Sequence, residues 1–185
     1  MSTISVKTHF AAGHRILNLT GAGAKCRNIH GHTFHVTWTF RQAPGDMQLE
    51  FGDLKTVLRG LITTHFDHVF IVQDSDDFQH YLKINDLRFY PTEHPPTTEV
   101  IAAEIARLTI DRLTRPQQRY FEKEEKPALW PDAELLAVQL QEGPDNAATW
   151  EPTPITVDGV PIPGLREALA ATPQRRPITT TEEPI

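Results

Sequence analysis

Residues 30–40 read HGHTFHVTWTF. From residue 32 to residue 40 this stretch is rich in β-branched and aromatic side chains, which predicts a half-buried strand. Residues 4–10, ISVKTHF, alternate with a two-residue period and predict an earlier strand. Side chains two apart in a strand point to the same face. We therefore expect His30 and His32 on one face of the strand and His35 on the other.

The rest of the sequence predicts further helices and strands around these two strands. Apolar residues repeat at helical spacing, and turn residues separate them from short apolar runs. We expect helices over residues 54–65 and 97–113, and strands over 135–140 and up to 150. The order strand, strand, helix, helix, strand, strand predicts an α+β fold with the helices on one face of the sheet.

Two segments are expected to be loops. Residues 18–25 carry two glycines, and residues 74–96 are polar and irregular apart from a short helix expected around residues 78–82. After residue 152 prolines recur and the last residues are polar. This composition predicts a main domain over residues 1–151 and a Pro-rich, partly disordered extension over residues 152–185.

Composition narrows the functional class. The chain has 185 residues, 39% of them hydrophobic, which suits a packed core of ordinary size. A formal net charge of -6 argues against a general nucleic-acid binder and against docking on anionic lipid. The sequence has no run of about 18 apolar residues, so we expect no membrane span. The N-terminal residues lack a signal-peptide pattern, and Cys26 has no second cysteine to pair with, so we expect a cytoplasmic protein.

Three histidines form a candidate metal site. His30 and His32 share a face, and His14 follows the first predicted strand, which could pair with theirs. Three histidines with an open fourth position are typical of catalytic zinc. Imidazole also suits copper, iron and nickel, so the residues do not fix the metal. Alternatively, the three histidines could be ordinary surface or core residues. Their closeness in the sequence to one another and to Cys26 argues against this alternative.

Four further residues are candidates for acid–base and binding roles. Cys26 lies between two basic residues and four positions before His30, where it could act as an acid–base group, ligate the metal as a fourth ligand, or be a buried structural cysteine. The carboxylate of Asp67 could orient the imidazole of His68. Glu142 ends a predicted strand, and its carboxylate could accept two N–H bonds from a guanidine-like edge.

Six blocks of sequence resemble the 6-pyruvoyltetrahydropterin synthase superfamily, and within it the bacterial 6-carboxytetrahydropterin synthases. The blocks occur in the family's order, over roughly residues 4–151. They are 10–15 (FAAGHR), 25–34 (KCRNIHGHTF), 50–55 (EFGDLK), 66–68 (FDH), 96–100 (PTTEV) and 141–142 (QE). The block that carries the cysteine and two of the histidines is the most specific of them.

The resemblance implies a fold and an activity. The fold would be the tunnelling fold, with a four-stranded antiparallel sheet and two helices on one face, assembled into a homo-oligomer, usually a hexamer built as a dimer of trimers. The substrate would be 7,8-dihydroneopterin triphosphate. The carboxy branch releases triphosphate and acetaldehyde, forms 6-carboxytetrahydropterin and supplies queuosine or other 7-deazapurine synthesis.

The resemblance also assigns roles to individual residues. The Zn²⁺ ligands would be His14, His30 and His32. The catalytic residues would be Cys26 as general base, with Asp67 and His68 completing a proton relay from an adjoining subunit. The substrate-binding residues would be Glu142 for the pterin edge, helped by Thr97, Thr98 and Glu99.

Some positions depart from the family pattern. Gly143 stands where a Thr often follows the anchoring Glu, and the 74–96 segment is longer than in compact members. The chain's acidity also requires a local basic patch for a triphosphate, for which Arg15, Lys25, Arg27 and Lys55 are candidates.

Three other functions are open from the sequence. The pyruvoyl branch would share the metal and the relay but keep the three-carbon side chain of the substrate. A non-catalytic pterin- or purine-binding module would have no need of Cys26, Asp67 and His68. A zinc hydrolase of unrelated fold would need a carboxylate at the metal-bound water, and no His-Glu-x-x-His motif occurs.

Overall fold

A computed structural model describes residues 2–42, 49–114, 130, 133–153, 155–157 and 160–162. Residues 1–151 and residues 152–185 form two separate compact units. The elements of the first unit are β1 (Ser2–His14), a 3₁₀ helix η1 (Gly21–Arg27), β2 (His30–Gln42), α1 (Phe51–His65), β3 (Val69–Gln73), α2 (Phe78–Ile84), β4 (Phe89–Thr92), α3 (Thr98–Thr114), β5 (Glu134–Glu142) and β6 (Ala147–Trp150).

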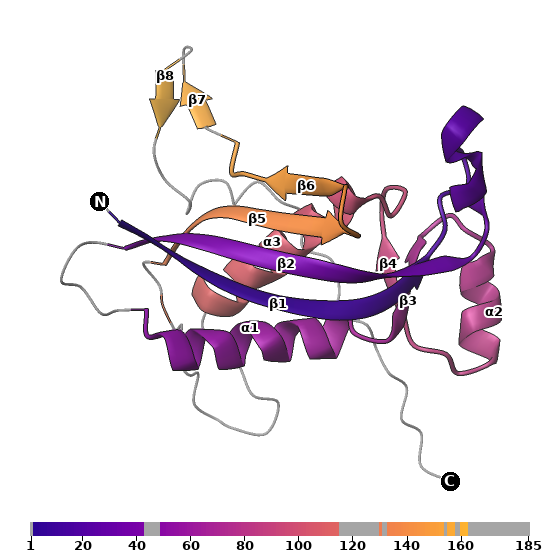
Figure 1. The fold of residues 1–185 in the computed structure, drawn as a ribbon, viewed down its shortest axis with the longest axis horizontal. Coiled ribbons are helices and arrows are strands. Elements are labelled where there is room, and N and C mark those ends of the chain that lie inside the picture. Colours follow the sequence, from indigo (N-terminus) through magenta and orange to yellow (C-terminus); the bar gives the residue numbers. More distant parts are fainter. Residues whose placement is uncertain are drawn as a thin grey trace, which may run out of the picture. The chain divides into compact units, whose positions relative to one another are not determined.

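The first unit is built on a long antiparallel pair of strands. All thirteen residues of β1 pair with β2, from Ser2 opposite Gln42 to His14 opposite His30. β5 pairs antiparallel with the far side of β2, and β6 pairs antiparallel with β5. These four strands form the antiparallel sheet expected from the sequence, and the α+β class is confirmed (Figure 1).

The expected count of four strands is too low. The sheet has six strands in the order β4-β3-β1-β2-β5-β6, because β3 and β4 add a parallel pair beside the end of β1. Residues 89–92 (FYPT) lie within the segment that was expected to be a loop because it is polar and irregular. Pro91 is tolerated because β4 is the outermost strand of the sheet.

Two other loop expectations are partly wrong. The segment expected as a loop at residues 18–25 contains most of η1, which the two glycines obscured. The segment at residues 74–96 holds α2 as well as β4, and the short helix expected near residues 78–82 is confirmed. Residues 43–46 (APGD), whose composition predicts a turn, lie outside the described residues.

One face of the sheet carries the core. All buried side chains of β1 and β2 are at even-numbered positions, from Val6 to His14 in β1 and from Phe34 to Phe40 in β2, whereas the odd-numbered ones are exposed or partly exposed. The helices α1 and α3 cover the buried face and contact each other (Figure 1). Their buried residues recur at helical spacing, as in Leu54, Leu58, Leu61 and Ile62 of α1. The alternation predicted from residues 4–10 and 32–40 is therefore the origin of the core.

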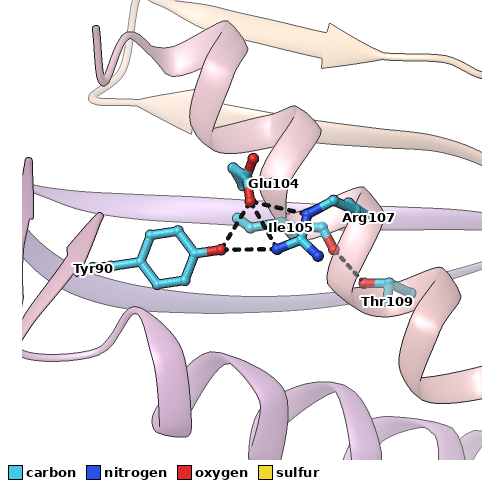
Figure 2. A network of polar contacts seen from close by, with 5 residues as sticks. All are labelled: Tyr90, Glu104, Ile105, Arg107 and Thr109. Carbon is cyan, nitrogen blue, oxygen red and sulfur yellow. Dashed lines mark hydrogen bonds and ion pairs between the residues drawn. The ribbon is translucent and has the colours of Figure 1, made fainter. Parts of the chain in front are cut away.

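A polar network ties α3 to the edge of the sheet (Figure 2). The hydroxyl of Tyr90 donates to the carboxylate of Glu104 at 2.8 Å, and Arg107 donates to that same carboxylate at 3.0 Å. Burial, together with the neighbouring Glu104 carboxylate, raises the pKa of Tyr90 above its usual range, so the phenol stays a donor. Every buried polar group of this network therefore has a partner, as a buried polar contact requires.

The second unit contributes one described hairpin. β7 (Ile155–Val157) pairs antiparallel with β8 (Val160–Ile162). The disorder expected in the extension falls mostly on residues outside the described part. Among the described helices, none is long and apolar enough to cross a membrane.

We predict that Thr109→Val destabilises the fold. The buried Thr109 hydroxyl accepts a 2.9 Å bond from Nε1 of Trp38 and donates to the carbonyl of Ile105, the second bond being visible in Figure 2. Valine keeps the shape but leaves the indole N–H buried without a partner, which costs about 1–3 kcal/mol. Urea denaturation measures the free energy of unfolding.

Thr114→Val is the matched control for this substitution. Its hydroxyl makes the same type of bond within α3, to the carbonyl of Ile110, at a half-buried position. The Thr114→Val variant should lose less than about 0.5 kcal/mol of the free energy of unfolding. Equal losses in the two variants would contradict a special role for the bond between Trp38 and Thr109.

Candidate metal centre and adjoining pocket

The strand pairing brings the three histidines together. His14 is the direct partner of His30 in the β1–β2 register, and His32 is two residues further along β2 on the same face. The ring centroids lie 4.5 Å apart for His14 and His30 and 5.0 Å apart for His30 and His32. His35 points to the opposite, exposed face, as expected from its position in the strand.

Gly31 lies where β1 and β2 approach each other closely, between the two histidines of β2. A Cβ atom at Gly31 would lie 3.1 Å from the carbonyl oxygen of Ala12 on β1, tighter than most real contacts. A glycine here allows the close approach of the two strands that carry the histidines.

Hydrogen bonds fix which ring nitrogens carry protons. Nδ1 of His14 lies 2.8 Å from the carbonyl oxygen of Pro96, and Nδ1 of His30 lies 2.8 Å from that of Asn28. A carbonyl oxygen only accepts, so each Nδ1 is the donor, and in the neutral ring Nε2 is left with a free lone pair. Nε2 of His14, His30 and His32 are all buried without a hydrogen-bond partner.

Glu142 adds an oxygen to the cluster. Residue 142 ends β5 opposite Phe34, which places its side chain next to His32. Its Oε1 lies 2.8 Å from Nε2 of His32 and 3.3 Å from Nε2 of His14, and its Oε2 accepts a short bond from the hydroxyl of Thr98. The ligand atoms of the three histidines and Glu142 all lie within 4.8 Å of one another.

The charges of these groups favour a cation. The His14 side chain and the Thr98 hydroxyl outweigh the opposing effect of burial and lower the pKa of Glu142 to about 2. Burial lowers the pKa of His32, opposed by Glu142 and assisted by the other two imidazoles. Neutral imidazoles and an ionised carboxylate are the protonation states that bind a metal ion.

The residues therefore fit a divalent metal ion. Buried polar atoms normally have hydrogen-bond partners. The three Nε2 atoms have none, and those of His14 and His32 face the Glu142 oxygen, which is an acceptor like a deprotonated ring nitrogen, so a cation bound between them is the best explanation. A set of three imidazoles and one carboxylate is typical of zinc and is shared by several transition metals. Pro96 and Asn28 supply the second hydrogen bond that metal-bound histidines usually make.

A pocket of about 430 Å³ adjoins the cluster. It is lined by five of the residues nominated from the sequence, together with residues of the β5–β6 turn and two apolar side chains. The nominated residues are Cys26, Thr97, Thr98, Glu99 and Glu142, and the others are Ile16, Leu19, Asp145, Asn146, Ala147 and Ala148. The structure thus joins the candidate base and the candidate substrate-binding residues in one place.

Cys26 reaches this pocket from η1. Its carbonyl oxygen accepts a 2.8 Å bond from the backbone N–H of Ile16, which fixes the short helix beside the end of β1. The thiol is half-buried. Cys26 is absent from the metal-binding cluster formed by the described residues, so the oxygen of Glu142, rather than the sulfur of Cys26, completes that set of four.

Asp67 and His68 lie outside the pocket. They follow α1, and their backbone is held to β1 because the N–H of His68 donates to the carbonyl of Ala11 at 2.7 Å. Nδ1 of His68 lies 3.0 Å from Oδ1 of Asp67, and 78% of the His68 side chain is exposed. Burial would raise the pKa of Asp67, but the bonds from Ala11 and His68 outweigh it and lower that pKa. The pair is an oriented imidazole that faces outward.

Arg15 is a structural residue. Its guanidinium donates from Nε and Nη2 to the buried carboxylate of Asp76, at 2.8 and 2.5 Å, and lies 4.9 Å from the centre of the Phe78 ring. This ion pair holds the chain beside His14 to the start of α2. This pair engages two of the five N–H donors of Arg15, and a contribution of Arg15 to a phosphate-binding patch stays a prediction.

Sequence reasoning missed several parts of the site. The carbonyl groups of Asn28 and Pro96 carry no signal in the sequence, because only the fold brings them to the histidines. The turn after Glu142 brings Asp145 and Asn146 to the pocket rim. In this turn Gly143 has a positive φ of 79°. That conformation favours glycine, which accounts for the departure noted at this position.

Comparison with known proteins identifies relatives of this arrangement. The family model described as 6-pyruvoyl tetrahydropterin synthase matches residues 3–153. A 6-carboxy-5,6,7,8-tetrahydropterin synthase of Rickettsia bellii is 28% identical over 117 residues, which are 60% of this chain and 83% of that protein. The protein of the same name from Haemophilus influenzae is 27% identical over 127 residues, 64% of this chain and 86% of the relative.

Solved structures share the fold. The crystal structure of an uncharacterized protein from Wolinella succinogenes matches with a TM-score of 0.59 at 19% identity and covers 81% of this chain and 97% of its own. The 6-pyruvoyl tetrahydropterin synthase of Plasmodium falciparum matches with a TM-score of 0.53 at 14% identity and covers 80% and 96%. At these identities the likeness concerns the fold alone.

We predict that Asp76→Asn destabilises the fold in a pH-dependent manner. The bonds from Arg15 outweigh burial and, with the N–H of Phe78, lower the pKa of Asp76. The folded state therefore favours the ionised carboxylate, and its stabilisation is complete well above the unfolded pKa of about 3.9 and lost as the pH falls through the lower folded value. At pH 7 the variant should lose about 2–4 kcal/mol, measured by denaturant unfolding.

The difference between the wild type and the Asp76→Asn variant should shrink below about pH 4, because the unfolded wild-type chain then binds a proton at Asp76 that the folded ion pair excludes. Asp77→Asn is the matched control, since it removes the same charge from an exposed neighbouring position. It should change stability by less than about 0.5 kcal/mol. If Asp76→Asn lost the same free energy of unfolding at pH 3 and at pH 7, the stabilisation could not come from the ion pair of Asp76 with Arg15.

Proposed function

The chain belongs to the 6-pyruvoyl tetrahydropterin synthase family, and from this premise we propose that it is a zinc-dependent 6-carboxytetrahydropterin synthase. It would convert 7,8-dihydroneopterin triphosphate to 6-carboxytetrahydropterin, with release of acetaldehyde and triphosphate. The observation that carries the proposal is the convergence of three unpartnered Nε2 atoms beside a pocket lined by Cys26. The names of the bacterial relatives support the carboxy branch.

The metal would be held by His14, His30 and His32. When bound, zinc supplies a Lewis acid that polarises oxygens of the pterin side chain and acidifies the neighbouring C–H bonds. The protein fixes the imidazoles through Pro96 and Asn28, so the binding nitrogens need no rearrangement to meet an ion.

The pocket would orient the pterin. Glu142 and Glu99 supply carboxylate oxygens, and Thr97 and Thr98 supply hydroxyl groups, which match the N–H donors of the guanidine-like edge of a pterin. The pocket's described lining includes no lysine or arginine, so we infer that the triphosphate lies outside this part of the site. Cys26, on the wall formed by η1, would remove a proton from the side chain of the substrate.

A second acid–base group would come from Asp67 and His68. Nδ1 of His68 faces Asp67, which leaves Nε2 directed to solvent and free to exchange a proton. Because this pair lies outside the pocket of its own chain, the proposal requires that an adjoining copy supplies it, in a homo-oligomer such as a hexamer. The product would enter queuosine or other 7-deazapurine synthesis in the cytoplasm.

The proposal is tested by turnover of 7,8-dihydroneopterin triphosphate, with and without added zinc, with products identified by mass. Zinc-dependent formation of 6-carboxytetrahydropterin and acetaldehyde is expected. Formation of 6-pyruvoyltetrahydropterin without acetaldehyde would assign the chain to the pyruvoyl branch. Pterin binding without any product from the folded, zinc-loaded protein would make it a binding module and contradict the proposal.

We predict that Cys26→Ala lowers kcat by about 10²–10⁴-fold, the contribution typical of a general base. The thiol is half-buried and lies outside the metal-binding cluster, so zinc content and thermal stability should change little. The measurement is kcat from a turnover assay, with the zinc content of the same sample determined by elemental analysis. An unchanged kcat would remove Cys26 from the mechanism.

We also predict that His32→Ala abolishes stoichiometric zinc binding, because it removes one of three ligands. His35→Ala is the matched control, since it lies on the same strand but on the opposite, exposed face. Isothermal titration with zinc should show one site per chain in the wild type and in His35→Ala, and none of comparable affinity in His32→Ala. Equal affinities in the two variants would contradict the site.

A further inference from the structure

We propose that Glu142 is itself a ligand of the bound metal when no pterin is present, and that it exchanges the metal for the pterin when the substrate enters. The inference rests on the proposed function and adds a second role to the residue expected only to anchor the pterin. It concerns the state of the site before catalysis.

The first argument is the position of the carboxylate oxygen. Oε1 of Glu142 lies within 3.3 Å of two of the three unpartnered Nε2 atoms, those of His14 and His32. The register of β5 against β2 produces this position, because residue 142 is opposite Phe34 and therefore adjacent to His32. A metal ion that binds the imidazoles would meet this oxygen without any change in the backbone.

The second argument is that the metal cluster and the pocket share Glu142. Of the residues that the structure describes, Glu142 alone belongs both to the four-residue cluster and to the pocket lining. The three histidines are not part of that lining. A pterin in the pocket would therefore contact the same carboxylate that faces the imidazoles.

The third argument is charge. Three neutral imidazoles leave the double charge of a divalent ion uncompensated in a place where 1% of the His14 side chain is exposed. An ionised carboxylate halves that charge, and Cys26, the other anionic candidate, lies outside the cluster. Thr98 holds the second oxygen of Glu142, so the side chain is already oriented with Oε1 towards the imidazoles.

The same atoms suit the guanidine-like edge of a pterin. A bidentate contact with the pterin edge needs both carboxylate oxygens turned towards the N–H donors, so the Oε1 atom that faces the imidazoles would have to turn away from the metal. The exchange would keep water away from the open metal position until the substrate arrives. It also makes metal affinity and pterin affinity interdependent, because they compete for one oxygen.

The first arm of the test measures zinc affinity by competition with a chromophoric chelator, without pterin. Glu142→Gln keeps the shape of the side chain but removes its charge, and should weaken zinc binding at least about tenfold, as loss of a metal-site partner does. Asp145→Asn is the matched control, because it removes one charge from the rim of the same pocket outside the cluster. Equal affinity in the wild type and Glu142→Gln would overturn the proposal, as would an equal loss in Asp145→Asn.

The second arm uses the unaltered protein with Co²⁺ in place of zinc. Addition of neopterin, which binds the pocket but does not react, should change the visible absorption of the Co²⁺ as the carboxylate leaves it. The Glu142→Gln protein should show a different spectrum before any pterin is added. A wild-type spectrum that neopterin does not alter at saturating concentration, with binding established by titration, would overturn the proposal.

These measurements are separate from turnover. If the zinc and Co²⁺ results are as expected but no product forms, the proposed function fails while the role of Glu142 as a ligand stands. If turnover is zinc-dependent but Glu142→Gln binds zinc as tightly as the wild type, the proposed function stands and this inference fails.

Discussion

The pairing of β1 with β2 determines both the core and the candidate metal centre. Because side chains alternate in a strand, the register that buries Phe10 against Phe34 also places His14 beside His30 on the same face. A shift of one residue would turn the core side chains of one strand to the exposed face and separate the imidazoles. The hydrophobic core therefore specifies the position of the metal ligands.

The metal centre lies where the apolar face of the sheet ends. Along β2 the positions on the core side change from buried aromatic and aliphatic residues to the partly exposed His32 and His30, while Phe34 contacts the rings of His14 and His32 edge-on. This arrangement holds the imidazoles against the core and leaves their Nε2 atoms buried without hydrogen bonds. Such a site costs free energy without a ligand, since buried polar atoms lack hydrogen bonds. A bound ion would recover that free energy, so metal binding and folding are expected to be coupled.

Much of this arrangement is predictable from local sequence. The strands at residues 4–10 and 32–40, the helices ending near residues 65 and 113, and the shared face of His30 and His32 all follow from periodicity. The strands β3 and β4 do not, because they are short and owe their position to the end of β1 and to the edge of the sheet. The location of Glu142 among the imidazoles depends on the β2–β5 register, which residues 134–142 do not specify by themselves. The carbonyl groups that orient His14 and His30 are backbone atoms and have no sequence signature.

The central claim is that three imidazoles of one chain hold a divalent ion through Nε2. The most direct measurement is anomalous diffraction at the zinc absorption edge from crystals of the zinc-loaded protein. The account predicts a peak about 2.0–2.1 Å from Nε2 of His14, His30 and His32. Zinc bound at one ion per chain but located away from these nitrogens, or no peak between them, would contradict it.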